Sequence, residues 1–186
     1  PIYPSNWSDI STMTISYGHG ISTSPVHLAA AYAALVNGGT LVTPTILKQS
    51  ASLIGERVIS QKVSMRLRSM LRRVVTDGTA SRFGEVKGYS VGGKTGTSDK
   101  HNSQGGYHDD KVLATFASFF PSSDPKYVLI VTLDEPEDRT GSEPRRTAGY
   151  TAVPIAAEVI RRVAPLLGIA PEIESKGHNS VTLANN

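Results

Sequence analysis

Apolar residues recur at helical spacing in three parts of the chain. A first helix is predicted to begin at Pro25, because Ser24 can cap its free N–H groups and proline is common at a first helical position. Gly38 and the glycine after it end this apolar run. A second helix is predicted from near Ser60 to Gly78, and a last one over residues 148–163, where apolar residues return every three or four positions.

Beyond Gly84 the pattern changes to runs of β-branched and aromatic residues. Three strands are predicted over residues 89–97, 112–120 and 127–133. We expect them to pair antiparallel in sequence order, which makes the first an outer strand. The second and third are apolar on both faces, so the last helix should cover one face and the helices within residues 25–77 the other. The prediction is an α+β fold in which helices cover both faces of a three-stranded antiparallel sheet.

The composition fits one ordinary globular unit. The chain has 186 residues, of which 39% are hydrophobic and 19% charged, and this balance excludes disordered and fibrous classes. The net charge of +3 comes from interspersed basic and acidic residues, so no nucleic-acid partner is indicated. No cysteine is present, which leaves the redox compartment open.

The ends of the chain and its short segments set the predicted boundaries. Residues 1–170 are expected to form part of one domain, followed by a polar, loosely held tail over residues 171–186. The apolar runs are far shorter than the roughly 18 residues that a membrane helix needs. The chain begins at Pro1 without a targeting segment, so it is expected to be an internal piece of a longer protein. Residues 41–47 hold Pro44 and suit a sheet edge.

The most informative stretch for chemistry runs over residues 92–98, with the sequence Gly-Gly-Lys-Thr-Gly-Thr-Ser. Residues 88–95 match the phosphate-binding pattern G-x-x-x-x-G-K-[ST]. That interpretation requires a buried strand before the loop and a helix beginning at Lys94. Instead, a charged segment precedes the stretch and a polar, glycine-rich segment follows it. A second interpretation is a glycine-rich turn with solvated side chains.

A third interpretation is the K-T-G strand of serine acyl-transferases of the penicillin-binding and β-lactamase group. A cation at Lys94 beside a serine favours proton transfer and attracts an anionic substrate terminus. Gly96 leaves room for a substrate backbone, and threonine hydroxyls can hydrogen-bond a carboxylate. A backbone N–H just beyond the glycine can point at a developing oxyanion.

A K-T-G triplet alone recurs by chance, and the surrounding segments make it specific. In their order along residues 15–168, these segments closely resemble class B penicillin-binding proteins, and two of them, Tyr-Gly-His-Gly and Asp-Glu-Pro, resemble the division-specific peptidoglycan transpeptidase. The segments are Ser16-Tyr17-Gly18-His19-Gly20, Thr23-Ser24-Pro25, the helix ending Val36-Asn37-Gly38-Gly39, the K-T-G strand, and Leu133-Asp134-Glu135-Pro136.

The resemblance implies a role for each residue of the strand. Lys94 would assist proton movement near the nucleophile, and the N–H of Thr97 would be one of two oxyanion donors, so these two are the catalytic candidates. Thr95, Gly96, Thr97 and Ser98 would bind substrate, with the threonine hydroxyls holding the carboxylate of a stem peptide or of a β-lactam. The resemblance implies no cofactor and no metal.

The family also requires a Ser-x-x-Lys on a helix and a Ser-x-Asn motif. Ser123-Asp124-Pro125-Lys126 fits the first pattern literally, but it follows the K-T-G strand and contains a proline, which indicates a turn. No serine is followed two residues later by asparagine. We therefore expect both motifs to lie in an upstream part of the parent protein, and this chain alone to be inactive.

Two polar segments are assigned to the surface. Residues 99–110 hold His101, His108, Asp109 and Asp110, but the spacing matches no metal-ligand motif, so a solvated loop beside the K-T-G strand is predicted. Arginines and acidic residues alternate over residues 137–146, which indicates a charged surface loop.

The resemblance implies a parent that cross-links peptidoglycan stem peptides during septal wall synthesis and is acylated by β-lactams. It would lie on the periplasmic side of the bacterial inner membrane, with its anchor upstream of this chain, and would contact membrane proteins of the division complex. One alternative is a carboxypeptidase or β-lactamase of the same fold, in which water is the acceptor. Another is a non-enzymatic β-lactam sensor, although no signalling segment is visible.

Overall fold

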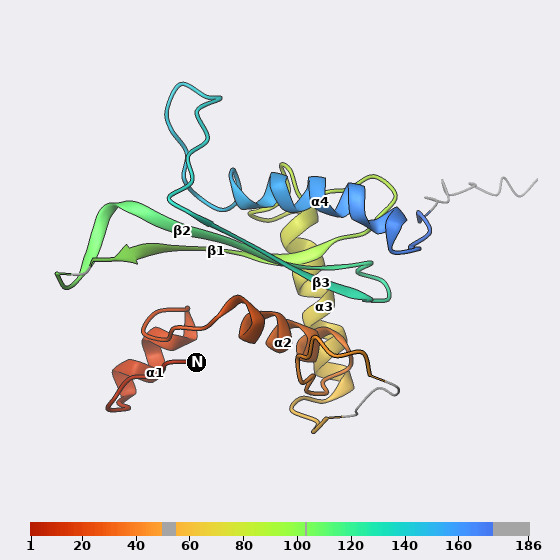
Figure 1. Cartoon of the computed structure of the whole chain (residues 1–186), viewed down its shortest axis with the longest axis horizontal. Helices are drawn as coiled ribbons and strands as arrows, with labels where there is room; N and C mark the ends of the chain where they lie inside the picture. The colour runs from red at the N-terminus through yellow and green to blue at the C-terminus, as the bar shows by residue number, and fades with distance from the viewer. Residues whose placement is uncertain (50–54, 103, 173–186) are drawn as a thin grey trace, which may run out of the picture.

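The computed structural model describes residues 1–49, 55–102 and 104–172 of the chain, and it has an α+β fold (Figure 1). Most of the predicted tail therefore lies outside the described residues. No helix in the described ranges is long and apolar enough to cross a membrane. The elements, in chain order, are α1 (Asp9–Ser16), α2 (Pro25–Val36), α3 (Gln61–Thr76), β1 (Gly92–His101), β2 (Tyr107–Phe120), β3 (Tyr127–Asp134) and α4 (Ala152–Leu166).

The three strands form one antiparallel sheet in the order β1-β2-β3, as predicted. Lys94 lies opposite Ala117 in the pairing of β1 with β2, and Phe116 lies opposite Val131 in the pairing of β2 with β3. The strand that carries Lys94 is thus an outer strand. In the part of the chain that the structure describes, no further strand pairs with the outer edge of β3.

Two of the predicted helices begin where their capping residues stand. The Ser24 side chain accepts a hydrogen bond from the N–H of His27 at the start of α2, and Ser60 accepts one from Val63 at the start of α3. The last helix begins at Ala152 rather than near residue 148, because residues 147–151 form turns first.

The helix α1 was missed by sequence analysis. None of its residues is buried, so it has no apolar stripe to produce a periodic signal. Its start is fixed instead by a reciprocal pair of hydrogen bonds between Ser8 and Ser11.

The segment over residues 41–47, which suited a sheet edge, joins no strand. The extended pairing nearby is an isolated bridge between Thr40 and Arg57.

The prediction of a solvated loop over residues 99–110 was wrong. β1 continues to His101 and β2 begins at Tyr107, and these two residues pair across a tight turn. Gly105 and Gly106 both have positive φ angles, which allows the chain to reverse within the turn. Polar side chains do not oppose pairing here, because the hairpin extends beyond the helices (Figure 1). At the other end, β1 begins at Gly92 rather than at residue 89.

The sheet is covered on both faces, with α4 on one side and α2 on the other (Figure 1). Phe116 is fully buried in a core that includes Val153 and Ile160 of α4. Ala117 and Phe119 point to the opposite face, because side chains alternate along a strand, and α2 packs there against β2 and β3. This arrangement confirms the prediction for α4 and α2.

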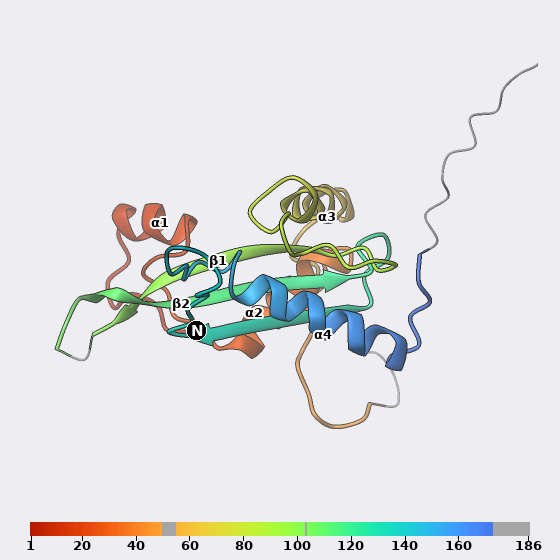
Figure 2. The same ribbon diagram turned by 90° about the horizontal axis from the view of Figure 1, so that it is seen from above.

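The helix α3 departs from the prediction that it lies on the α2 face. It packs beside the outer edge of β1 (Figure 2). Val75, near the end of α3, is buried in the core that also includes Val153 and Ile160 of α4. The Arg72 Nη1 donates a hydrogen bond of 2.8 Å to the carbonyl oxygen of Val91, just before β1. A free sheet edge offers such backbone acceptors to a neighbouring side chain, and hydropathy alone does not indicate this placement.

The buried stripe of α4 leads to a stability prediction. Ile160 is fully buried, whereas Ile155 on the same helix is 44% exposed. We expect Ile160→Val to lower the free energy of unfolding by about 0.5–1.5 kcal/mol, the range for losing one buried methylene. Urea denaturation measures the loss, and Ile155→Val is the matched control, with an expected change below about 0.5 kcal/mol. Equal losses at the two positions would contradict the placement of α4.

Candidate active site

The predicted site residues lie together on β1 but on both faces of the sheet. Thr95 lies opposite Phe116 and Thr97 opposite Ala114, so both threonine side chains point to the α4 face. The Lys94 side chain, opposite Ala117, points to the α2 face, as does that of Ser98, and Gly96 lies between them without a side chain. The strand edge between the two faces is the place where all five groups can be reached by one molecule.

Two polar groups are directed along the edge of β1 that β2 does not cover. The exposed Lys94 Nζ donates a hydrogen bond of 2.7 Å to the carbonyl oxygen of Thr95, so this carbonyl points away from β2. Backbone groups alternate in direction along an antiparallel strand, which places the N–H of Thr97 on the same side. The ammonium group of Lys94 and the backbone N–H of Thr97, three positions apart in sequence, therefore lie on the same edge.

The glycines of the strand have different surroundings. A Cβ on Gly93 would lie 2.6 Å from the carbonyl oxygen of Ala117, and one on Gly92 would collide with the ring of Phe119. These two glycines are required by packing. A Cβ on Gly96 would meet nothing closer than the Thr115 carbonyl oxygen at 4.0 Å, so the space beside Gly96 is open. Packing does not explain Gly96, whereas the approach of a substrate backbone would.

The threonine hydroxyls line a cavity of about 510 Å³ on the α4 face. The Thr97 Oγ1 accepts a hydrogen bond of 3.0 Å from the N–H of Ala148. The Thr95 Oγ1 lies 2.6 Å from the Thr79 Oγ1. Arg82 also lines this cavity. Sequence analysis missed Thr79 and Arg82, because both come from the turn after α3 and no local pattern indicates that this turn lies beside β1.

A second hollow, of about 470 Å³, adjoins the other side of the same strand segment. Ser98 lines it together with the segment that contains His19. The His19 ring lies 5.3 Å from the Tyr107 ring between centroids, and its Nε2 is 3.4 Å from the Tyr107 hydroxyl. The Tyr-Gly-His-Gly segment and the K-T-G strand, far apart in sequence, are thus brought together.

An ion-pair group joins the Asp-Glu-Pro segment to β1. The Lys100 Nζ lies 2.9 Å from Asp134 and 2.8 Å from Glu135. The hydrogen bond from Lys100 holds the pKa of the Glu135 carboxyl below its usual value. Lys111 of β2 also contacts Glu135, at 3.3 Å. These contacts tie the three strands together beyond the site and leave Lys94 outside the ion-pair group.

The charged loop over residues 137–146 is more ordered than its sequence indicates. Asp138 and Arg145 form an isolated backbone bridge and an ion pair of 2.7 Å. The Arg145 guanidinium lies over the Tyr150 ring, 4.3 Å from its centroid, and Tyr150 lines the threonine cavity.

Within residues 1–49, 55–102 and 104–172, no group of three or more His, Cys, Asp or Glu side chains is arranged to hold a metal ion.

The literal Ser-x-x-Lys pattern lies in the turn between β2 and β3, as predicted. The Ser123 hydroxyl donates a hydrogen bond of 2.6 Å to Glu172, and Lys126 forms an ion pair of 2.6 Å with Asp124. Ser123 and Lys126 are therefore not stacked on a helix, as the nucleophile motif of the family requires.

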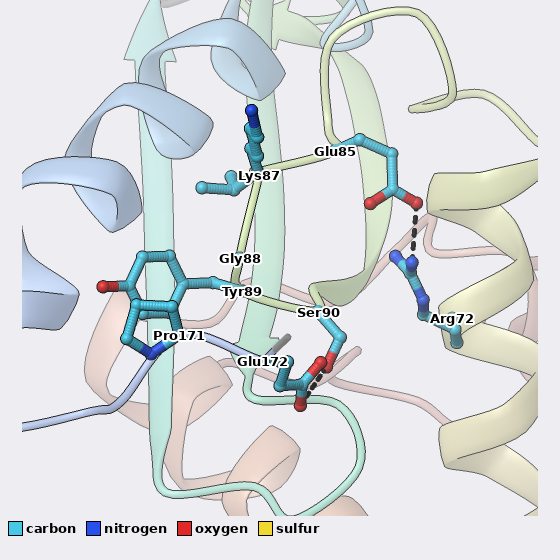
Figure 3. A pocket seen from close by; sticks show the side chains of 9 residues that line it. Arg72, Glu85, Lys87, Gly88, Tyr89, Ser90, Pro171 and Glu172 are labelled. Atoms are coloured by element: carbon cyan, nitrogen blue, oxygen red, sulfur yellow. Dashed lines mark hydrogen bonds and ion pairs between the residues drawn. The ribbon is translucent and has the colours of Figure 1, made fainter. Parts of the chain in front are cut away.

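A larger cavity, of about 820 Å³, lies away from all the predicted site residues. It is lined by the segment before β1, by Arg72 and by residues 171 and 172. Figure 3 shows its two polar contacts, an ion pair of 2.7 Å between Arg72 and Glu85 and a hydrogen bond of 2.9 Å from Ser90 to Glu172. Four of its polar side chains are thus paired with each other.

The geometry excludes a phosphate loop and fits a transpeptidase domain. A phosphate loop requires a helix beginning at Lys94, but β1 continues through this residue to His101. An outer strand that carries Lys-Thr-Gly-Thr, with helices on both sheet faces, is the arrangement expected for the penicillin-binding and β-lactamase group.

Comparisons with known proteins agree. Residues 2–161 match the family model for the penicillin-binding protein transpeptidase domain, and the chain belongs to this family, among its class B members. A probable peptidoglycan D,D-transpeptidase FtsI of Caulobacter vibrioides is 35% identical over 195 residues, which cover 100% of this chain and 32% of that protein. Stage V sporulation protein D of Bacillus subtilis is 35% identical over 178 residues, 88% of this chain and 26% of that protein.

Solved structures show the same fold. The apo transpeptidase domain of penicillin-binding protein 3 from Burkholderia pseudomallei has a TM-score of 0.80 and 33% identity, covering 93% of this chain and 51% of that chain. A structure described as a peptidoglycan glycosyltransferase from Burkholderia ambifaria has a TM-score of 0.75 and 29% identity, covering 93% of this chain and 50% of that chain. The chain thus spans about half of these structures and about a third of the curated relatives.

Proposed function

We propose that the full-length protein containing this chain is a serine-type peptidoglycan D,D-transpeptidase that cross-links stem peptides and is acylated by β-lactams. One observation carries the proposal: the outer edge of β1 presents the Lys94 ammonium, the Thr97 N–H and two threonine hydroxyls around an open space at Gly96. These are the groups needed to hold a carboxylate and to stabilise an oxyanion beside a serine.

In the proposed reaction, the serine comes from a part of the protein outside this chain. Its oxygen attacks the carbonyl carbon of a D-Ala-D-Ala bond, and the serine proton passes to the nitrogen of the departing D-alanine. Lys94 assists this proton transfer, and the Thr97 N–H stabilises the negative oxygen of the tetrahedral intermediate. An amine of a second peptide then attacks the acyl ester, the bond to the serine oxygen breaks, and the amine proton passes to that oxygen, which frees the serine and forms the cross-link.

The terminal carboxylate of the donor peptide would be bound on the α4 face. The hydroxyls of Thr95 and Thr97 point there, and Arg82 supplies a positive charge in the same cavity. Among the described residues, no acidic side chain lines this cavity, so the bound carboxylate would meet no like charge from that part of its walls. A β-lactam carboxylate would occupy the same position. Gly96 and Ser98 would contact the substrate backbone along the strand edge.

A role in septal wall synthesis is part of the proposal. It is supported by the similarity to a protein named FtsI and to a sporulation protein, and by the Tyr-Gly-His-Gly and Asp-Glu-Pro segments. In that role, the protein would act on the periplasmic side of the inner membrane and contact membrane proteins of the division complex.

The acceptor separates this proposal from a hydrolase of the same fold. The full-length protein would be incubated with a pentapeptide stem donor and an acceptor peptide that carries a free amine. Mass spectrometry should show release of D-alanine and a cross-linked dimer that penicillin suppresses. Omission of the acceptor is the control, and the dimer should then disappear. Free acid as the main product with acceptor present would favour a carboxypeptidase, and a stable acyl-protein without turnover would favour a sensor.

A further inference from the structure

Each threonine hydroxyl of β1 has a polar neighbour outside the strand. The Thr97 Oγ1 accepts a hydrogen bond from the N–H of Ala148. An N–H group is a donor only, so the direction of this bond is fixed and the Thr97 hydroxyl keeps its own hydrogen for another acceptor. The Thr95 Oγ1 and the Thr79 Oγ1 lie 2.6 Å apart, and either of them can donate to the other.

The direction of the bond between Thr79 and Thr95 is decided when an anion binds. A carboxylate has acceptor atoms only, so Thr95 can bind it only by donating its single hydrogen to it. The Thr95 oxygen then becomes the acceptor in its bond with Thr79. The Thr79 hydroxyl would therefore act on Thr95 as the N–H of Ala148 acts on Thr97, and both O–H groups would point at the same ligand.

The position of Thr79 is fixed by its backbone. The next residue, Ala80, is fully buried in the core and donates a hydrogen bond of 3.1 Å from its N–H to the Val74 carbonyl oxygen. On the other side, a Cβ on Gly149 would lie 2.6 Å from the carbonyl oxygen of Thr79, so the two backbones are in close contact. Thr79 is exposed at its side chain but held on both sides of its backbone.

We propose that Thr79 is a positioning residue for carboxylate recognition, which donates its hydroxyl hydrogen to Thr95 and thereby directs the Thr95 hydroxyl hydrogen at the carboxylate of the substrate or β-lactam. This inference rests on the proposed function and adds to it a residue from outside the K-T-G strand. It also predicts cooperativity, because a hydroxyl that donates to a charged group becomes a better acceptor.

The test uses the full-length protein with Thr79→Val, which keeps the shape of the side chain and removes its hydroxyl. The second-order rate constant of acylation by benzylpenicillin should fall about 10-fold, as expected for losing one bond that supports a charged hydrogen bond. The methyl ester of benzylpenicillin has no carboxylate, so its slower acylation should change less than threefold. The ratio of the two rate constants should therefore shrink, which a general structural defect would not cause.

Three further variants complete the design. Thr79→Ser keeps a hydroxyl and should restore the ratio. Thr76→Val, at the end of α3 and outside the residues that line the cavity, removes an exposed threonine hydroxyl and should leave the ratio unchanged. In a Thr95→Val background, Thr79→Val should add nothing, because its effect passes through Thr95. Thermal melting checks that each variant is folded, and Thr79→Ala replaces Thr79→Val if the valine prevents folding.

The outcomes separate this inference from the proposed function. Equal loss with the acid and the ester, or additive losses in the double variant, would overturn the role of Thr79 while leaving a working transpeptidase. A normal rate in Thr79→Val would do the same. If the unaltered full-length protein is not acylated at all, the proposed function fails, and the role of Thr79 fails with it.

Discussion

Lys94→Ala in the full-length protein is expected to slow acylation by a chromogenic β-lactam by about 100-fold or more. A positioned charge or oxyanion donor is typically worth two to three orders of magnitude in rate. Lys94 is exposed, and its Nζ donates to the carbonyl oxygen of the neighbouring Thr95, so its loss should not disturb packing. Stopped-flow measurement of the acylation rate tests this directly.

A matched lysine controls for the loss of charge. Lys87 is exposed in the segment before β1 and lines the larger cavity away from the site. Lys87→Ala changes the net charge equally and should leave acylation within about twofold of the original rate. Thermal melting of the two variants should agree closely, since both side chains are exposed. An unchanged acylation rate in Lys94→Ala would make this lysine a bystander and remove the main support for the proposed chemistry.

The sequence indicated the strand of the site because local rules agreed there. Runs of β-branched and aromatic residues indicated β2 and β3, and the K-T-G pattern marked β1. Serine caps gave the starts of α2 and α3 to within one residue. The antiparallel order followed because the segments between neighbouring strands were short enough for a direct return.

The walls of the site could not be found in the same way. Thr79 and Arg82 are separated from Thr95 by more than ten residues. Thr79 meets Thr95, and Arg82 lines the same cavity, next to Ala80, which is anchored in the core. The placement of α3 beside the edge of β1 likewise depends on the bond from Arg72 to the Val91 carbonyl oxygen. Contacts of this kind depend on the packed backbone, and no periodic pattern in the chain records them.

The hairpin beyond the site shows a limit of polarity as a guide. Residues 99–110 are polar and rich in glycine, which favoured a loop, yet backbone pairing continues to His101 and Tyr107. A two-stranded extension in solvent needs a tight turn and has no need for an apolar face when it continues a larger sheet. The extension brings Tyr107 against His19, so the wall of the second hollow depends on this continuation.

The 186-residue chain on its own is expected to form no lasting covalent adduct with penicillin. In the proposed mechanism, Lys94 and the Thr97 N–H would assist an attack but would supply no nucleophile. The one Ser-x-x-Lys pattern in the chain lies in a turn, where the Ser123 hydroxyl already donates to Glu172. Intact-mass measurement after incubation with benzylpenicillin should show the unmodified mass, whereas the full-length protein should gain one drug mass.

An adduct could be absent because the chain lacks a nucleophile or because the isolated chain is unfolded. Circular dichroism of the isolated chain distinguishes these two reasons. A folded chain without an adduct would support a serine that lies elsewhere in the full-length protein, because the β1 edge would then be formed but have no attacking group. An unfolded chain would leave the full-length protein as the decisive sample, and peptide mapping of its adduct should place the drug on a serine outside these 186 residues. An adduct mapped to a serine within the chain, Ser123 included, would show that the proposed division of the active site is wrong.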